Sequence, residues 1–513
     1  MLRVFNPVLY CSVAFFVLAA HVELAQSPQS ATVTGFVTQV KSPNRFEIGA
    51  FDVVLTEDAK CKAVIYRTRH FWFNPQLAPQ LYGADAPSRK SEKRAAESIL
   101  PCEHLNLVVG SWVSVDGIYN LSGILSAHSL AVYRRLDLDQ IKDGAILEED
   151  ARLGKDHGAK ADIWLNGYPF EVNGQTEIRT AREGVELEPT FHGPYSINIG
   201  HSWLSNEAQA ASSEQLTAGH CATYRASTGP DSRFLAEQLL VWPCETDRKA
   251  RRFSLSLRAK EVNAPGYQHA RPGYIQLRGT SNPLVIIPNQ SLQDYVTHVG
   301  MEVVPSYAKR QADAMSGSTV FRFYVVRTLG KMKLSFRPLE YGIGARRDYK
   351  SPVMPMPDGL IIIAADGGIT SLNNEAQLSA LLSIAVTEVL QRQGFIANQG
   401  HWNLASYDND ALSLLEEGQA LRIGIRQMYL AGYDIREAPF SWLVAQGKPV
   451  NNPIIDSKDP DEEIPWYAAY AFDYISKYYS DVDYSKLKRG EQEYAQFLEE
   501  LRKADPQAFE PSK

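Results

Sequence analysis

The chain has 513 residues, of which 44% are hydrophobic, and a formal net charge of -7 at pH 7. This length favours about three domains, and the hydrophobic fraction is ordinary for folded cores. Because surfaces that bind nucleic acid are normally basic, the acidic balance argues against a nucleic-acid partner.

An apolar run opens the chain. Residues 8–20 follow Arg3 and are apolar apart from Ser12, and Ala25 stands where a signal peptide would be cleaved. The run is shorter than the roughly 20 residues that a transmembrane helix needs. We therefore expect residues 1–25 to be a signal peptide, and the mature protein to be extracytoplasmic, periplasmic or secreted, without a transmembrane span. Glu23 is atypical near such a site, so the cleavage point stays open.

Short alternating runs make up residues 31–135, for example residues 32–37, 63–66 and 105–120, with Gly110 and Gly117 as breaks. Such runs predict a small all-β barrel or sandwich. The V-G-x-x-V-x-V-x-G pattern of residues 109–117 resembles the small OB-like barrels of bacterial envelope proteins. Between these runs, the Lys- and Arg-rich residues 86–98 are interpreted as a polar helix.

Residues 136–162 are charged and poor in aromatic residues, and we interpret them as a linker. The strand pattern then repeats over residues 163–280, in segments such as 163–172, 217–224 and 239–242. We interpret this region as a second β-barrel-like domain and as a diverged copy of the first.

Four cysteines remain after the signal peptide, two in each predicted barrel: Cys61, Cys102, Cys221 and Cys244. In an oxidising compartment the natural pairings are Cys61 with Cys102 and Cys221 with Cys244. Reduced, buried thiols are the alternative. Because the sequence has no C-x-x-C, the cysteines indicate neither zinc nor redox chemistry.

Helical periodicity dominates residues 288–513. An apolar stripe with helical spacing follows Ser291, a candidate N-cap, and residues 319–326 and 360–363 have strand composition. Asn374 and Gln377 suit the N-cap and capping box of a further helix. The aromatic residues of 466–479 recur every three or four positions, which favours a helix packed on the domain over a partner surface. The expected fold is two small all-β barrels followed by an α+β, mainly helical domain.

One helix of this domain carries a family resemblance. Residues 373–390 read N-N-E-A-Q-L-S-A-L-L-S-I-A-V-T-E-V-L, similar to the N-E-A-Q-L-A-A-V-L-x-H-E-x-x-H-V of metallopeptidase family forty-eight, the HtpX-like and BepA-like enzymes. The resemblance covers residues 291–446 and includes 293–307 and the A-G-Y-D of 431–434. It implies that residues 357–363 supply the edge strand along which family substrates lie.

The catalytic residues of that family are missing. By the resemblance, Ile384 replaces the first zinc-binding His, Ala385 the general-base Glu and Glu388 the second His. An H-E-x-x-H helix places two imidazoles on one face to hold Zn²⁺ while the carboxylate activates the bound water. Glu417 retains the third ligand, but Leu421 replaces the family Asp that orients a zinc ligand. Loss of such a residue typically costs about 10-fold to 100-fold in metal affinity.

A weaker zinc site could use Glu388, Glu417 and a borrowed imidazole such as His401. Glu388 is otherwise explained as the ion-pair partner of Arg392 at i+4. We predict no catalytic residue and no metal cofactor, with zinc bound only if this alternative holds. If no metal is bound, the apolar side chains of Ile384 and Leu421 would fill the space that the metal occupies in the family.

Three functions remain open. The favoured one is a catalytically inactive metallopeptidase homologue that binds polypeptide, or an envelope protein, as a scaffold. The second is an active zinc peptidase with unusual ligands. The third is a protein whose barrels bind glycan or peptide, with the peptidase-like domain as a structural base.

Overall fold

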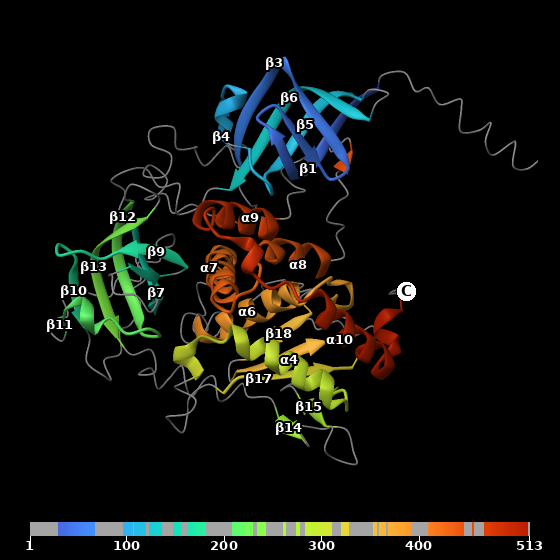
Figure 1. Cartoon of the computed structure of the whole chain (residues 1–513). Coiled ribbons are helices and arrows are strands. Elements are labelled where there is room, and N and C mark those ends of the chain that lie inside the picture. Colours follow the sequence, from blue (N-terminus) through green and yellow to red (C-terminus); the bar gives the residue numbers. More distant parts are fainter. Residues whose placement is uncertain are drawn as a thin grey trace, which may run out of the picture. The chain divides into compact units, whose positions relative to one another are not determined.

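A computed structural model describes residues 29–66, 96–105, 107–119, 123–135, 147–155, 162–165, 167–180, 208–228, 233–242, 260–262, 273–276, 283–309, 320–327, 352–356, 359–365, 368–391, 409–445, 454–455 and 466–510 (Figure 1). The chain forms two compact units. The first comprises residues 1–66, 95–134 and 451–464, and the second comprises the rest.

The first unit is built on a sheet that closes on itself. Its elements are β1 (Gln29–Ser42), β2 (Arg45–Ile48), β3 (Phe51–Tyr66), β4 (Ala96–Ile99), the 3-10 helix η2 (Cys102–Leu105), β5 (Trp112–Tyr119), β6 (Ile124–Arg135) and β20 (Ile454–Ile455). The pairing order is β2-β1-β5-β6-β3, and β2 also pairs with β3, which closes a ring of five strands. Strand β4 extends the sheet from β3, and β20 pairs with β1.

Alternation along these strands explains the closed ring. Val113 and Val115 on β5 face inward with Val33 on β1 and Leu125 on β6, and all are fully buried. Thr32, on the other face of β1, donates a hydrogen bond to Asp116 of β5 (2.6 Å). The two-residue period therefore separates a core face from a polar face. The predicted all-β barrel is confirmed as a five-stranded ring.

The polar helix predicted over residues 86–98 is wrong at its end, because Ala96–Ile99 form strand β4.

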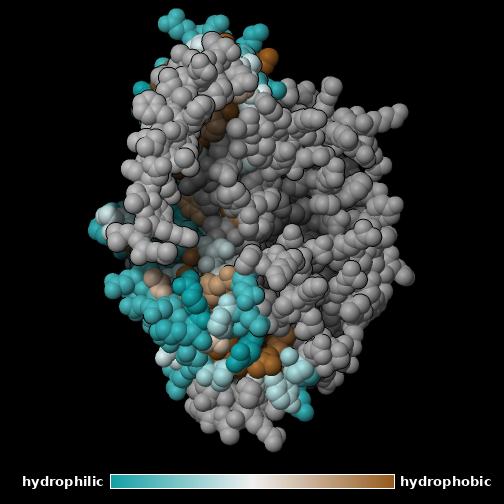
Figure 2. Space-filling view, turned by 90° about the vertical axis from the view of Figure 1, so that its right-hand side faces the viewer, coloured by the Kyte–Doolittle hydropathy of each residue, from teal (hydrophilic) through white to brown (hydrophobic). Residues whose placement is uncertain are grey.

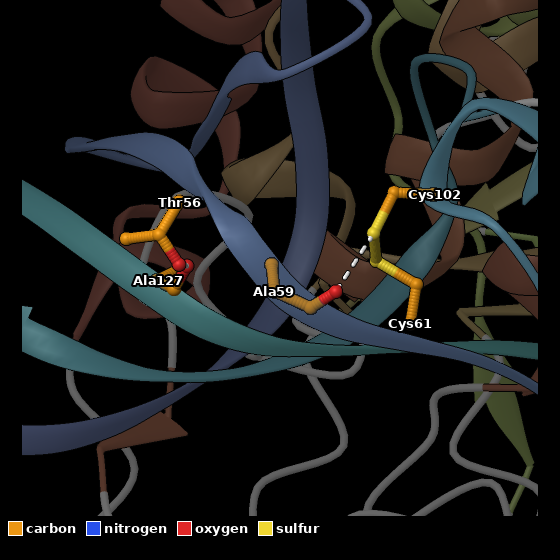
Figure 3. The surroundings of a disulfide bond; sticks show 5 residues. All are labelled: Thr56, Ala59, Cys61, Cys102 and Ala127. Carbon is orange, nitrogen blue, oxygen red and sulfur yellow. Dashed lines mark hydrogen bonds between the residues drawn. A yellow bond between two sulfur atoms is a disulfide. The ribbon is translucent and has the colours of Figure 1, made fainter.

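A disulfide joins Cys61 of β3 to Cys102 of η2, which confirms the predicted pairing (Figure 3). The Sγ atom of Cys102 also lies 3.4 Å from the carbonyl oxygen of Ala59. On the same strand the hydroxyl of Thr56 donates to the carbonyl oxygen of Ala127 on β6 (3.1 Å). The bridge therefore ties η2 to a strand that is itself held in the ring. Cys244 lies outside the described residues, so the second pairing, with Cys221, stays a prediction.

The second unit begins with a second ring. Its elements are β7 (Leu147–Lys155), β8 (Asp162–Leu165), β9 (Tyr168–Glu171), β10 (Glu177–Thr180), β11 (Gln209–Ala210), the 3-10 helix η4 (Ser213–Gln215), β12 (Cys221–Thr228) and β13 (Phe234–Trp242). The order is β13-β12-β7-β8-β9, and β9 pairs back to β13 in parallel. The linker predicted over residues 136–162 therefore needs correction, because it contains β7, which pairs with both β12 and β8.

The remainder of the second unit is mixed. Its strands are β14 (Lys260–Val262), β15 (Tyr274–Gln276), β16 (Leu284–Val285), β17 (Arg322–Val326), β18 (Val353–Pro355) and β19 (Leu360–Ala364). Its α-helices are α4 (Gln290–Val303), α6 (Glu375–Gln391), α7 (Asn409–Leu430), α8 (Ala438–Ala445), α9 (Trp466–Tyr478) and α10 (Glu491–Ala504), with 3-10 turns η8 (Ile369–Ser371), η10 (Ile435–Glu437), η11 (Tyr484–Lys486) and η12 (Pro506–Phe509). No helix in the described part of the chain is long and apolar enough to cross a membrane.

The strand predicted at residues 360–363 is present but is not an edge strand. Strand β19 lies between β17, its parallel neighbour, and β18, its antiparallel neighbour. All five residues of β19 are buried. A continuous apolar run is typical of a strand covered on both faces, so the edge-strand prediction drawn from the resemblance is wrong.

The predicted helix starts are close to those observed. Asn289, rather than Ser291, caps α4, because its side chain accepts from the backbone N–H of Leu292. At α6 the carboxamide oxygen of Asn374 accepts from the N–H of Gln377 (2.9 Å), as predicted. The side chain of Gln377 accepts from the N–H of Asn373 (2.8 Å), one residue before the N–H of Asn374 that the predicted capping box would use.

Helix α10 has one apolar face that is buried and one charged face that is exposed. Tyr494, Phe497 and Leu501 are buried, whereas acidic and basic side chains cover its outer face. Figure 2 views the molecule from the side on which α10 lies in Figure 1, and the described residues on that face are largely hydrophilic, with small hydrophobic areas between them.

Replacing Cys61 and Cys102 together by Ala should lower the free energy of unfolding of the first ring by about 3–4 kcal/mol, because the bridge closes a loop with a sequence separation of 41. Urea unfolding followed by far-UV circular dichroism measures this. Reduced wild-type protein is the matched control and should be destabilised equally. Equal stability of the oxidised wild type and the double variant would contradict the prediction.

Candidate functional site

The residues that the resemblance aligns with the zinc site lie where α6 packs against α7. Ile384, Ala385 and Leu421 are 6%, 3% and 1% exposed and belong to one apolar cluster. A β-carbon added to Gly424 of α7 would lie 3.0 Å from Cγ1 of Ile384, 3.1 Å from Oγ of Ser383 and 3.2 Å from the backbone nitrogen of Ile384. The two helices therefore approach closely at Ser383 and Ile384, and the side chain of Ile384 is packed in this contact.

The hydroxyl side chains of α6 form hydrogen bonds within the helix. The hydroxyls of Ser379 and Ser383 donate to the carbonyl oxygens three residues earlier, Ala376 and Ala380, at 2.9 Å each. Thr387 donates to the carbonyl oxygen of Ser383 (2.8 Å). Such local bonds allow a hydroxyl to be buried without a partner on another element. Helix α6 can therefore be buried along most of its length.

The other predicted ligands are not brought together in the described structure. Glu388 is partly buried on α6, one turn after Ile384. Glu417 lies on α7, but its side chain, like the whole of His401 and Arg392, is outside the described part. Among the described residues, no group of three or more His, Cys, Asp or Glu side chains is arranged to hold a metal ion.

A buried polar network at the start of α6 was missed by the sequence analysis. Glu375 is 1% exposed and accepts hydrogen bonds from the hydroxyls of Tyr295 and Tyr433, each at 2.8 Å, and it pairs with Lys488. Buried carboxylates are tolerated only when their lone pairs are satisfied. Glu375 meets this requirement with partners from three other segments.

A second carboxylate extends the network. The side-chain amides of Asn374 and Gln377 donate to Oε2 of Glu437 at 3.0 and 2.8 Å. Arg489 pairs with the other oxygen of Glu437 at 2.7 Å. The N-cap residue of α6 is therefore held by η10 and by the segment before α10.

The segment before α10 also completes the cap of α6 through its backbone. The N–H groups of Glu375 and Ala376, which lack intrahelical partners, donate to the carbonyl oxygens of Gly490 (3.2 Å) and Arg489 (3.0 Å). Gly490 has φ +68°, and a β-carbon there would lie 2.7 Å from Cβ of Glu375. Only glycine fits both the backbone conformation and the space.

Tyr433, the tyrosine of A-G-Y-D, stands between two carboxylates. Its hydroxyl lies 2.8 Å from Oε1 of Glu375 and also hydrogen-bonds to Glu302. Burial raises the pKa of the Tyr433 hydroxyl well above its usual value, and the bond to Glu302 raises it further. Because a phenol has a single proton, Tyr433 donates to one of these two carboxylates at a time.

On another side of α7, the hairpin of β8 and β9 packs against the helix. A β-carbon on Gly167 would lie 2.6 Å from Cβ of Arg422. The guanidinium of Arg422 lies 4.3 Å from the ring centroid of Tyr168, and that of Arg426 lies 3.5 Å from the ring of Trp164. Cation–π contacts strengthen when they are desolvated, and both arginines are buried.

Helix α9 completes this contact. Tyr470 accepts from Arg422, and the hydroxyl of Tyr474 donates to the carbonyl oxygen of Gly167. Tyr470, Tyr474 and Tyr479 are at most 3% exposed, which confirms that the aromatic tail packs on the domain. The second ring and the helices share one continuous apolar cluster, although the sequence analysis divides them at residues 280 and 288.

No protein-family model matches the chain, and no curated protein matches it.

Replacing Ile384 by Ala should lower the free energy of unfolding by about 2–5 kcal/mol, because it opens a cavity at the closest approach of α6 and α7. The conservative Ile384→Val change is the control and should cost about 0.5–1.5 kcal/mol. Denaturant unfolding monitored by tryptophan fluorescence measures both. An Ala variant as stable as the wild type would mean that the position is not packed.

Replacing Tyr433 by Phe should cost about 1–3 kcal/mol, because the buried carboxylate of Glu375 and the partly exposed carboxylate of Glu302 both lose this hydroxyl as a partner. Tyr295→Phe is the matched control: it removes a single bond to Glu375 from a partly buried residue and should cost less. Thermal unfolding of both variants tests the order of these effects. A larger loss of stability in Tyr295→Phe than in Tyr433→Phe would show that Tyr433 does not hold the network together.

Proposed function

We propose that the chain is a catalytically inactive homologue of the HtpX-like zinc metallopeptidases, which acts as a polypeptide-binding or scaffold protein of the bacterial cell envelope. The observation that carries this proposal is the close contact between α6 and α7 at Ile384 and Gly424, with Ile384 buried in the apolar cluster. A hydrolytic zinc site needs three protein ligands and an open position for water. Ile384 has no lone pair to offer and its side chain occupies the contact.

The structural roles of the resembling residues support the proposal that the chain is a homologue of this peptidase family. The residues that carry the resemblance outside the ligands are used structurally: Asn374 and Gln377 cap α6, and Tyr433 bonds Glu375 at its start. The helix that bears the family motif is thus held in place although two of its catalytic positions, Ile384 and Ala385, are apolar. Such a fold could keep a peptide-binding surface without peptide hydrolysis.

Strand order supports the proposal that both rings are OB-like. When the five strands of each ring are numbered in chain order, neighbouring strands in both rings follow the order one-two-three-five-four, and strand four pairs back with strand one. Identical closure of two consecutive rings is the result expected from duplication of one Greek-key barrel. The disulfide of the first ring supports an extracytoplasmic location, because such bonds persist in oxidising compartments.

Metal analysis tests the chemistry. Protein purified without chelator should contain less than about 0.1 equivalent of zinc, because the helix has lost both imidazoles of the motif. Glu417→Ala should leave this content unchanged. About one equivalent of zinc in the wild type, lost with Glu417→Ala, would instead favour an active peptidase with unusual ligands.

Binding of an unfolded polypeptide tests the scaffold role. Fluorescently labelled, reduced and carboxymethylated lactalbumin should bind the protein without being cleaved over hours, whereas the native, disulfide-bonded form should not bind. Fluorescence anisotropy and gel electrophoresis read out the two effects. Failure to discriminate between the two forms would count against recognition of extended chain.

A further inference from the structure

A short strand from late in the sequence lies on the first ring. Residues 451–464 belong to the first unit, although their chain neighbours on both sides belong to the second. Within this segment β20 pairs antiparallel with β1, with Val33 opposite Ile455 and Thr34 opposite Ile454. The closed ring therefore carries an additional strand that is more than 300 residues away in the chain.

The position of β20 follows from the other partners of β1. Val33 and Thr34 also pair with Val115 and Ser114 of β5. A strand has two hydrogen-bonding edges, so β20 must use the edge opposite β5. Strand β2 uses that same edge further along, from Val37 to Ser42. Strand β20 thus pairs with the part of the edge that β2 does not reach.

The described pairing comprises two residues of each strand, and the flanking sequence does not favour a longer ladder. Pro453 precedes β20 and has no N–H to donate, and Asp456, a poor strand former, follows it. Two paired residues supply few backbone hydrogen bonds, each of modest net stabilisation in water. Intramolecular attachment compensates for this, because a tethered segment has an effective concentration in the millimolar range. A weak tethered strand of this kind can exchange with a competing one.

We propose that this edge of β1 is an acceptor site for an extended polypeptide strand, and that Ile454 and Ile455 are its built-in occupant. The ligand class is a stretch of extended chain with β-branched aliphatic residues, as in β20, that adds to the sheet through its backbone. A ligand without the flanking proline forms a longer ladder and displaces β20. This inference stands on the first ring and does not depend on the proposed function.

The test releases the occupant in the full-length protein. In Ile454→Pro/Ile455→Pro the segment can no longer donate to β1, whereas Ile454→Val/Ile455→Val keeps its strand propensity and is the matched control. The probe is a fluorescein-labelled peptide of residues 451–464 with Pro453→Thr and Asp456→Thr. We expect it to bind the proline variant at least about 10-fold more tightly than the wild type or the valine control, because the tethered competitor is gone.

Hydrogen exchange supplies the second readout. The amides of β1 around Val33 and Thr34 should exchange faster in the proline variant and regain protection when the peptide is added. Circular dichroism and the Cys61–Cys102 disulfide report that the ring stays folded. Equal peptide affinity for all three proteins, or a folded proline variant that neither binds peptide nor changes its exchange at β1, would overturn the proposal.

Discussion

The second unit depends on the burial of α6, which packs against α4, α7 and α8. A helix that is buried on nearly all sides must satisfy its polar groups without water. Helix α6 does so in two ways: its serine and threonine hydroxyls bond to its own carbonyl oxygens, and its first N–H groups bond to Gly490 and Arg489. The segment before α10 is thereby joined to the centre of the unit, and the apolar surface of α6 is left to organise the core.

The chemistry of α6 changes along its length. At its start, Glu375 and Glu437 hold tyrosine, lysine, arginine and amide partners from four segments. Further along, at Ser383 and Ile384, the contact with α7 is close. The start of the helix therefore carries the polar network, and its middle carries the packing against α7.

The two rings use the same closing order but are stabilised differently. The first has a disulfide and β20. The second has the contact of Gly167, Tyr168 and Trp164 with buried arginines of α7 and tyrosines of α9. Small barrels have modest cores and gain from such additional links. The different links also explain why one ring forms a compact unit with β20, whereas the other shares its core with the helices.

Local patterns in the sequence determined the element types: the two-residue alternation of the rings, the cap of α6 by Asn374 and Gln377, the aromatic helix α9, and the cysteine pair of the first ring. They could not determine partners that are distant in the chain. The place of β7 in the second ring, the central position of β19, the tyrosine shared by Glu302 and Glu375, and the pairing of Ile454–Ile455 with β1 all join segments tens to hundreds of residues apart. Those pairings follow from the closure of sheets and the burial of α6, and only the tertiary structure decided them, because no local periodicity encodes which distant backbone or carboxylate a residue will meet.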